Sequence, residues 1–426
     1  MDSTFAGFAL ATAHGTPVLA RPADRYKTFR LSLLWQRPLD AGQAARAILP
    51  QLLQHGTAAH PDRPALARAR EMLYGLGLGF ATGRCGESTV LRLSADAVAG
   101  DFLPDRPDQF AAVLGLLREH LLRPQLEDGA FPAAVFERER AQALAAAGAA
   151  WDDKAHWARL RAVIEACEGE PYGVPDHGGE AALEALDARA PAAMLDDFLR
   201  RGRRAVLLSG KLPADPIAAI EPLLASLPQD AAAALPPIRL PAPRPARTRE
   251  ERAPMQQAKL VLVHRVPPPT TAAARCALQV AVSLWGGGPH SRLFREVRER
   301  LSLCYYASAG GDADKGLVLV QVACDAGAAP AVREQVAAQL RELAAGAFTD
   351  DELATAIAQV QSPLRSVDDS AAARLSFTAE QWLRGIDQTP EQRIAALAAV
   401  GRDAVAAAAA SLWLDLDYAL LPEASA

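Results

Sequence analysis

The chain has 426 residues, of which 50% are hydrophobic and 22% are charged. This composition can bury a sizeable core and excludes global disorder, and the length is typical of two domains or of one duplicated unit. The formal net charge is −5 with both signs well mixed, so we expect neither nucleic-acid binding nor a polybasic membrane anchor.

The first half begins with Met1-Asp2-Ser3-Thr4, which lacks the basic start and the apolar run of a signal peptide. No stretch of about 18 apolar residues follows, so we expect no membrane span. Apolar residues alternate at Phe29, Leu31, Leu33 and Trp35, which predicts a half-buried strand. The later elements predicted in this half are helices over 41–54 and 62–73, a strand over 89–94, helices over 107–123, 131–167 and 190–201, and a strand over 205–208.

A proline-rich stretch then separates the two halves. Residues 229–254 include Pro236, Pro237, Pro241, Pro243, Pro245 and Pro254. Proline has no backbone donor and restricts φ, so this composition favours an extended connector. We therefore predict one domain over 1–228, a linker over 229–254 and a second domain over 255–426.

The second half repeats the order of elements in the first. It predicts a strand over 259–264, a helix over 271–284, a glycine-rich turn, a helix over 291–302, a strand over 316–324, and helices over 328–345 and 349–363. Both halves thus contain strand, helix, helix and strand before further helices, a weak sign of duplication. This order predicts an α+β fold of two similar domains, each a mostly antiparallel sheet with packed helices.

Cysteine and histidine spacing gives no sign of a disulfide framework or a metal site. The five cysteines are scattered and form no Cys-x-x-Cys, which favours reduced thiols and a cytoplasmic location. His55 and His60 are the only close histidine pair, and Gly56 lies between them. Their spacing does not stack them on one helix face, so we interpret them as surface or loop residues.

The most informative segment covers residues 286–305, which read GGGPHSRLFREVRERLSLCY. Phe294, Arg298 and Leu301 are spaced to share one helix face, which would put a partly desolvated guanidinium beside an apolar seam. Its fixed donors can hold peptide carbonyls, and the Tyr305 hydroxyl can add another donor. The alternative is an arginine that reaches solvent from a packed helix, with Tyr305 only starting a strand. The glycines lack the Gly-Lys-Ser/Thr ending of a phosphate loop, so nucleotide binding is not expected.

This segment resembles the C-terminal-domain signature of the pitrilysin/insulinase zinc peptidases of clan ME. In that family an Arg and a Tyr seven positions later contact the bound peptide, and Arg298 and Tyr305 match them in type and spacing. Residues 69–75, 151–155 and 167–173 resemble a branch of inactive bacterial members whose partner carries the zinc motif. The resemblance covers most of the chain and implies two similar halves joined by a linker, as in mitochondrial processing peptidase.

Active members of that family carry His-x-x-Glu-His, in which two histidines bind zinc and the Glu activates the zinc-bound water. None of the eight histidines here belongs to such a motif. Gly56-Thr57 resembles the sequence after the zinc helix, which puts Ala47 and Gln51 at the ligand positions and Pro50 at the base. The distal Glu ligand falls near Ala146. A proline inside a helix costs about 3 kcal/mol, so we expect the helix to kink or to begin late.

The resemblance therefore implies a non-catalytic, substrate-binding subunit of a heterodimeric zinc metalloendopeptidase. A homologous partner would carry the zinc, and this chain would hold no cofactor but would contribute Arg298 and Tyr305 to peptide binding. Two alternatives stay open. The chain is a structural scaffold that keeps the Arg/Tyr pair for packing, or it is an escort that binds a peptide without any peptidase.

Overall fold

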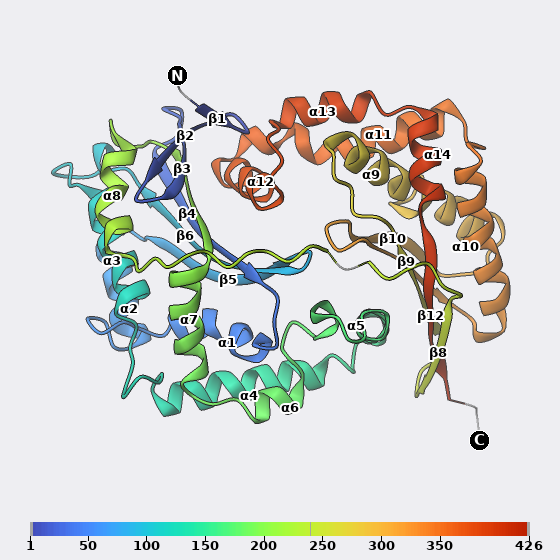
Figure 1. Cartoon of the computed structure of the whole chain (residues 1–426), viewed down its shortest axis with the longest axis horizontal. Helices are drawn as coiled ribbons and strands as arrows, with labels where there is room; N and C mark the ends of the chain where they lie inside the picture. Colours follow the sequence, from blue (N-terminus) through green and yellow to red (C-terminus); the bar gives the residue numbers. More distant parts are fainter. Residues whose placement is uncertain (1–2, 239, 424–426) are drawn as a thin grey trace. The chain divides into compact units, whose positions relative to one another are not determined.

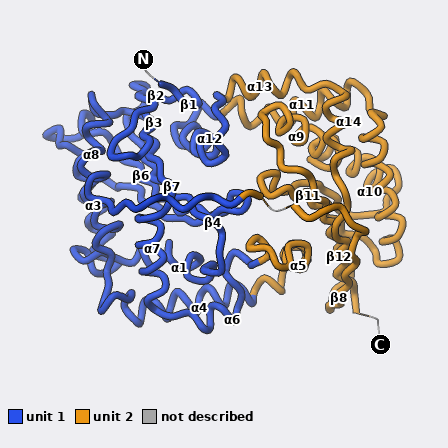
Figure 2. The backbone as a smooth tube through the Cα atoms, viewed as in Figure 1, with its two compact units in different colours: residues 1–148, 174–236, 367–389 blue, residues 149–173, 237–366, 390–426 orange. Residues whose placement is uncertain are grey.

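The computed structural model describes residues 3–238 and 240–423 (Figure 1). They form two compact units, shown in Figure 2. Unit 1 takes its residues from 1–148, 174–236 and 367–389, and unit 2 takes its residues from 149–173, 237–366 and 390–426.

Unit 1 is built on a seven-stranded sheet in the order β1-β2-β3-β7-β4-β6-β5. Neighbouring strands are antiparallel except β3 and β7, which are parallel. The strands are β1 (Ser3–Phe5), β2 (Phe8–Ala13), β3 (Thr16–Pro22), β4 (Thr28–Pro38), β5 (Gly77–Cys85), β6 (Ser88–Val98) and β7 (Arg203–Gly210).

Both faces of this sheet are covered. The alternating residues of β4 from Phe29 to Trp35 point into the main core, where they meet apolar residues of α1, α3, α7 and α8. The predicted strand is confirmed, but it is buried on both faces rather than half-buried. Leu34, on the opposite face, packs with Leu375, Ala379 and Trp382 of α12. The helices of unit 1 are α1 (Gln43–Leu53), α2 (Arg63–Met72), α3 (Gln109–Leu122), α4 (Ala133–Ala149), α6 (Glu180–Glu184), α7 (Ala190–Arg201), α8 (Pro216–Ser226) and α12 (Ala371–Arg384).

Unit 2 contains a five-stranded sheet in the order β10-β11-β9-β12-β8, antiparallel except for the parallel pair β8 and β12. Its strands are β8 (Arg247–Ala253), β9 (Ala258–Arg265), β10 (Tyr306–Asp312), β11 (Leu317–Cys324) and β12 (Trp413–Pro422). Its helices are α5 (Lys154–Ala166), α9 (Ala272–Gly286), the π-helix η3 (Leu293–Arg300), α10 (Ala329–Ala344), α11 (Asp350–Arg365), α13 (Pro390–Ala398) and α14 (Arg402–Ala410).

Among the described residues, α5 is the helix that covers the second face of the unit 2 sheet. Ala158, Ala162 and Ala166 lie along one side of α5 and pack on β9, β11 and β12. Small side chains at this spacing let the helix approach the strands closely. The main core on the other face contains residues of α9, η3, α10 and α14.

Each unit thus takes one helix from the other half of the sequence. α5 belongs to the first half and packs in unit 2, whereas α12 belongs to the second half and packs in unit 1. The compact units therefore differ from the contiguous division at the proline-rich stretch. The reason is physical, because a sheet with two apolar faces must be covered on both.

Several predicted elements need correction. The single helical stretch over 131–167 is two helices, because the Asp153 side chain accepts from the Ala155 and His156 amides at 3.0 Å and caps a new helix. The predicted linker over 229–254 ends in β8, which pairs with β12. Strands β1 to β3 precede the first predicted strand, and β5 occupies a glycine-containing segment that resembles a helix stop.

The α+β fold class with two mostly antiparallel sheets is confirmed. No helix in residues 3–238 and 240–423 has the length and apolar character needed to cross a membrane.

Candidate functional site

The positions that the resemblance assigns to the zinc motif lie on α1. Ala47 is half-buried, Pro50 is buried and Gln51 is exposed. Pro50 lies inside the helix and has no N–H for the Arg46 carbonyl. The Thr82 hydroxyl of β5 donates to that carbonyl at 3.3 Å instead. The helix begins at Gln43 and runs through the proline to Leu53, so of the two expected outcomes, a kink or a late start, the late start does not occur.

The fourth position, Ala146, is an exposed residue near the end of α4. The buried carboxylate of that helix is Glu139, which binds Arg138 at 2.8 Å and Arg63 at 3.2 Å. Two guanidinium groups therefore already occupy it. Within the described residues, no three His, Cys, Asp or Glu side chains lie together as metal ligands would. A methyl group, a pyrrolidine ring and an amide can neither hold zinc as an active site does nor take a proton from water.

His55 lies in the turn that follows α1, which agrees with the predicted surface or loop position, and it is half-buried. Burial, together with the charges of Arg138 and Arg63, lowers its pKa. Nearby cations oppose both protonation of His55 and the binding of a metal cation there.

Arg298 lies on η3, where the sequence predicted an α-helix. The Leu301 amide donates to the Glu296 carbonyl at 3.0 Å, five residues back, which is the hydrogen bond of a π-helix. Such segments are frequent at functional sites. Arg298 is exposed, and its guanidinium carbon lies 4.5 Å from the centre of the Phe294 ring. The charge is therefore stacked on one aromatic ring in solvent, rather than desolvated along an apolar seam.

Tyr305 lies immediately before β10 and is 55% exposed. Its amide donates to the Ala323 carbonyl at 2.8 Å, which holds the backbone against β11. Its hydroxyl donates to Asp325 Oδ1 at 3.2 Å, and the carboxylate raises the pKa of Tyr305. Because the hydroxyl proton is engaged with Asp325, the phenol presents lone pairs outward. The structure therefore favours an acceptor, whereas the sequence suggested a donor.

A short turn connects these two residues. The Leu303 amide donates to the Val297 carbonyl at 3.0 Å, and Ser302 has a φ of 51°. Cys304 is buried in the turn, where burial raises the pKa of its thiol and the charge of Arg298 opposes that rise. Arg298 and Tyr305 thus occupy the two ends of one hydrogen-bonded turn, and both are exposed.

The turn leads into β10, which is an edge strand of the unit 2 sheet. An edge strand carries backbone donors and acceptors on its unpaired side, and an extended peptide can use them. The sequence pointed to Arg298 and Tyr305 but missed Asp325. No local signal connects Asp325 with Tyr305, because only the pairing of β10 with β11 brings them together.

These features define a class of protein. It has two α+β units, and the positions assigned to a zinc motif hold side chains that do not bind zinc. Comparison with known proteins agrees. The family described as Peptidase M16 inactive domain matches residues 193–360. A curated relative, "Probable inactive metalloprotease YmfF" of Bacillus subtilis, is 24% identical over 399 residues, which cover 93% of each chain. An uncharacterized zinc protease of Streptomyces coelicolor is 33% identical over 138 residues, or 32% of this chain and 30% of that protein.

Solved structures show the same architecture. A conserved protein from Enterococcus faecalis has a TM-score of 0.90 at 25% identity, covering 97% of this chain and 98% of that one. A peptidase M16 inactive domain from Pseudomonas fluorescens has a TM-score of 0.81 at 21% identity, covering 98% and 99%. The match over residues 193–360 and these likenesses confirm the resemblance seen in the sequence: this chain is similar to inactive members of the M16 peptidase family.

Proposed function

We propose that this chain is the substrate-binding, non-catalytic subunit of a heterodimeric zinc endopeptidase. One observation carries the proposal. The four positions of the zinc set hold Ala47, Pro50, Gln51 and Ala146, while Arg298 and Tyr305 are exposed on an ordered turn beside an edge strand. A chain that lacks the catalytic groups but exposes hydrogen-bond donors and acceptors can bind a peptide without hydrolysing it.

The chain's own residues supply positioning. The Arg298 guanidinium offers several fixed donors to peptide carbonyls, and its contact with Phe294 limits its freedom. The Tyr305 hydroxyl, whose proton is held by Asp325, accepts from a peptide N–H. Zinc in the homologous partner would supply the activated water. Holding the scissile peptide still lowers the entropic part of the barrier, and donors near the carbonyl stabilise developing charge.

Reconstitution tests the proposal. The chain is co-expressed with a homologue that carries His-x-x-Glu-His, and cleavage of a peptide library is measured for each chain and for the complex. We expect a copurifying complex that cleaves, with little cleavage by either chain alone. Arg298→Ala should lower kcat/KM by about tenfold or more, the cost of one charge-assisted hydrogen bond, without preventing assembly.

Arg300→Ala is the matched control. Arg300 is exposed on the same helix, but it forms an ion pair with Glu296. The control complex should cleave like the unmutated one. If the Arg298→Ala complex also cleaves at the unmutated rate, Arg298 is not part of the site.

The same experiment separates the two alternatives. A scaffold subunit predicts that the partner cleaves equally well alone, and the Phe294 contact then serves only packing. An escort protein predicts that the isolated chain binds peptides and that no zinc-bearing partner copurifies.

A further inference from the structure

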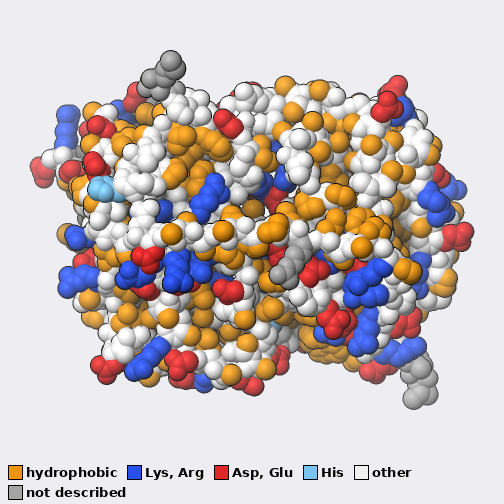
Figure 3. Space-filling view, in the orientation of Figure 1, with side chains coloured by type: hydrophobic (Ala, Val, Ile, Leu, Met, Phe, Trp, Pro, Cys, Tyr) orange, Lys and Arg blue, Asp and Glu red, His pale blue; other side chains and the backbone are white. Residues whose placement is uncertain are grey.

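A cavity in unit 1 has no role in the proposed peptide binding. Its volume is about 260 Å³, and its lining includes Arg200, Arg203, Arg204, Gln229, Asp230 and Trp382. It lies where β7 begins, beside α12 and the end of α7. Figure 3 shows Lys and Arg side chains gathered on the surface over this part of unit 1. We propose that this cavity binds a small oxyanion, a carboxylate or a phosphate group.

Arg204 is a buried cation surrounded by neutral groups. It is 7% exposed. Its Nε donates to Thr16 Oγ1 at 2.6 Å, its Nη1 donates to the Pro228 carbonyl at 3.2 Å, and its Nη2 donates to the Gln229 side-chain oxygen. Burial lowers the pKa of Arg204, and no acidic group opposes that effect. A guanidinium removed from water without a counter-charge is costly, so the position favours an incoming anion.

Arg203 lines the same cavity and likewise has no acidic partner among the described residues. Its guanidinium carbon lies 3.9 Å from the centre of the Trp382 ring. Its Nη1 donates to Gln36 Oε1 at 3.0 Å and its Nη2 to the Trp382 carbonyl at 3.4 Å. Both partners are neutral. Among residues 3–238 and 240–423, neither Arg203 nor Arg204 has a carboxylate as a hydrogen-bond or ion-pair partner.

The nearest acidic groups are committed elsewhere or remain in solvent. Asp196 pairs with Arg200 at 2.8 Å. Asp230 is exposed, and its amide donates to the Arg200 carbonyl at 2.9 Å. With Arg200 neutralised by Asp196, the cavity keeps two guanidinium groups against one solvent-exposed carboxylate.

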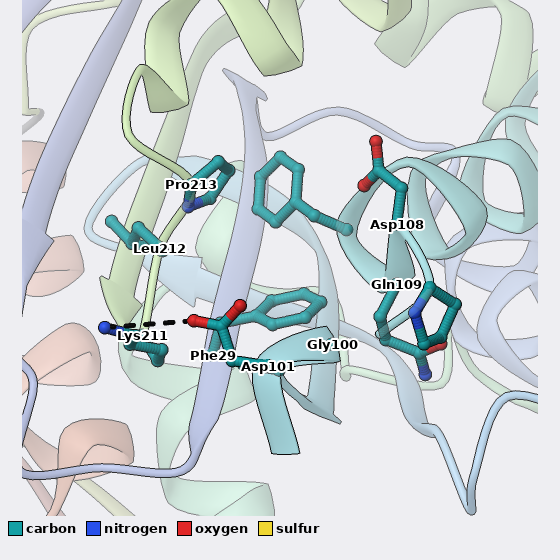
Figure 4. A pocket seen from close by; sticks show the side chains of 11 residues that line it. Phe29, Gly100, Asp101, Asp108, Gln109, Lys211, Leu212 and Pro213 are labelled. Carbon is teal, nitrogen blue, oxygen red and sulfur yellow. Dashed lines mark ion pairs between the residues drawn. The ribbon is translucent and has the colours of Figure 1, made fainter. Parts of the chain in front are cut away.

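Two other cations of the same chain are paired with carboxylates. Arg265 in unit 2 is fully buried, and it meets Glu170 at 2.8 Å and Asp415 at 3.1 Å. In a different cavity of unit 1, Figure 4 shows Lys211 paired with Asp101, at 4.0 Å. Asp24, which is not part of that lining, lies 2.8 Å from Lys211. Cations at those places have acidic partners from the chain, whereas Arg203 and Arg204 do not.

The chemistry of the lining defines the ligand class. Guanidinium groups present planar pairs of donors that match the oxygens of a carboxylate or a phosphate. The cavity is smaller than those that hold drug-sized ligands, which are about 300–1,000 Å³. A free inorganic anion or the acidic end of a small molecule fits this description. The inference does not depend on the peptide-binding proposal.

Calorimetric titration of the full chain with sodium phosphate and, separately, sodium acetate tests the site at constant ionic strength. We expect saturable binding of at least one anion, and the two titrations distinguish a phosphate site from a carboxylate site. Gln229→Glu should lower the affinity about tenfold or more, because it puts a carboxylate against Arg204. Arg203→Gln should also weaken binding.

Gln142→Glu is the matched control, because Gln142 is an exposed residue of α4 and receives the same change of charge. It should bind the anion as the unmutated chain does. Gln229 is exposed, so its substitution is compatible with folding. The proposal is overturned if neither anion binds saturably, or if the Gln229→Glu and Gln142→Glu variants bind equally well.

Discussion

At the scale of single residues, the pair Tyr305 and Asp325 determines what the candidate peptide site can offer. The Asp325 carboxylate accepts a hydrogen bond from the Tyr305 hydroxyl, so in the proposed site Asp325 would act on a peptide through Tyr305. A phenol and a guanidinium at opposite ends of one turn then present an acceptor and a set of donors. A peptide group, with one N–H and one carbonyl, is complementary to such a pair.

Asp325→Asn tests this arrangement directly. A negative charge beside a phenol disfavours the phenolate, so its removal should lower the pKa of Tyr305 toward the ordinary value. The measurement is an ultraviolet titration of phenolate, with Tyr305→Phe used to subtract the other tyrosines. An unchanged Tyr305 titration in Asp325→Asn would mean that the hydrogen bond does not persist in solution.

At the scale of elements, a buried group of charges joins three strands of unit 2 to the end of α5. Asp415 lies at a bulge in β12, is fully buried, and meets Arg244 at 3.0 Å, Arg247 at 3.3 Å and Arg265 at 3.1 Å. Arg247 and Arg265 also donate to the Ala166 carbonyl at the last turn of α5. Carbonyls at a helix end lack partners within the helix, so these arginines fix α5 on the sheet.

Asp415→Asn should therefore destabilise unit 2 by up to about 3–5 kcal/mol at neutral pH, because it removes one of the two carboxylates that compensate the buried Arg265 and leaves only Glu170. Burial alone would raise the pKa of Asp415, but its bonds to Arg244 and Arg265 hold that pKa below 3.8. A depressed carboxyl pKa contributes stability that is present above pH 3.8 and is lost as the pH falls through the folded-state pKa.

Urea unfolding as a function of pH measures this contribution. The difference between the unmutated chain and Asp415→Asn should shrink only in that acid range. Asp152→Asn, which changes an exposed carboxylate of the same unit, should have little effect at any pH. A constant difference down to strong acid would show that the ionised form of Asp415 is not the source of stability.

At the scale of the whole molecule, the exchange of helices means that neither half of the sequence contains everything its sheet needs. Residues 1–228 include all seven strands of unit 1 but lack α12. Without α12 the face formed by Phe8, Leu19 and Leu207 loses its cover. An exposed apolar sheet face favours aggregation.

The fragment 1–228 should therefore bind a hydrophobic dye and aggregate when it is expressed alone. A synthetic peptide of residues 367–389 should suppress both, because Leu375, Ala379 and Trp382 cover that face. A peptide with Leu375→Asp and Trp382→Asp should not. If the bare fragment is monomeric and binds no dye, α12 is dispensable for unit 1.

The sequence by itself determined the elements with strong local signals and the resemblance to a family. The alternation from Phe29 to Trp35 identified β4, and the sequence contains no His-x-x-Glu-His, with Ala47, Pro50 and Gln51 at the positions that the resemblance assigns to that motif. The segment around Arg298 carried the resemblance, because its motif depends on residues close together in the chain.

Only the tertiary structure decided which helix covers which sheet, which carboxylate holds Tyr305, and which arginines lack an acidic partner. The sequences of α5 and α12 do not show which of the two sheets each helix covers. The strand β8 pairs with β12, which follows it by more than a hundred residues. Tyr305 donates a hydrogen bond to Asp325 across a strand pair, and Arg204 donates one to Thr16, which is distant in the sequence. Long-range packing selects these partners, since local periodicity and spacing carry no information about which surface an element will meet.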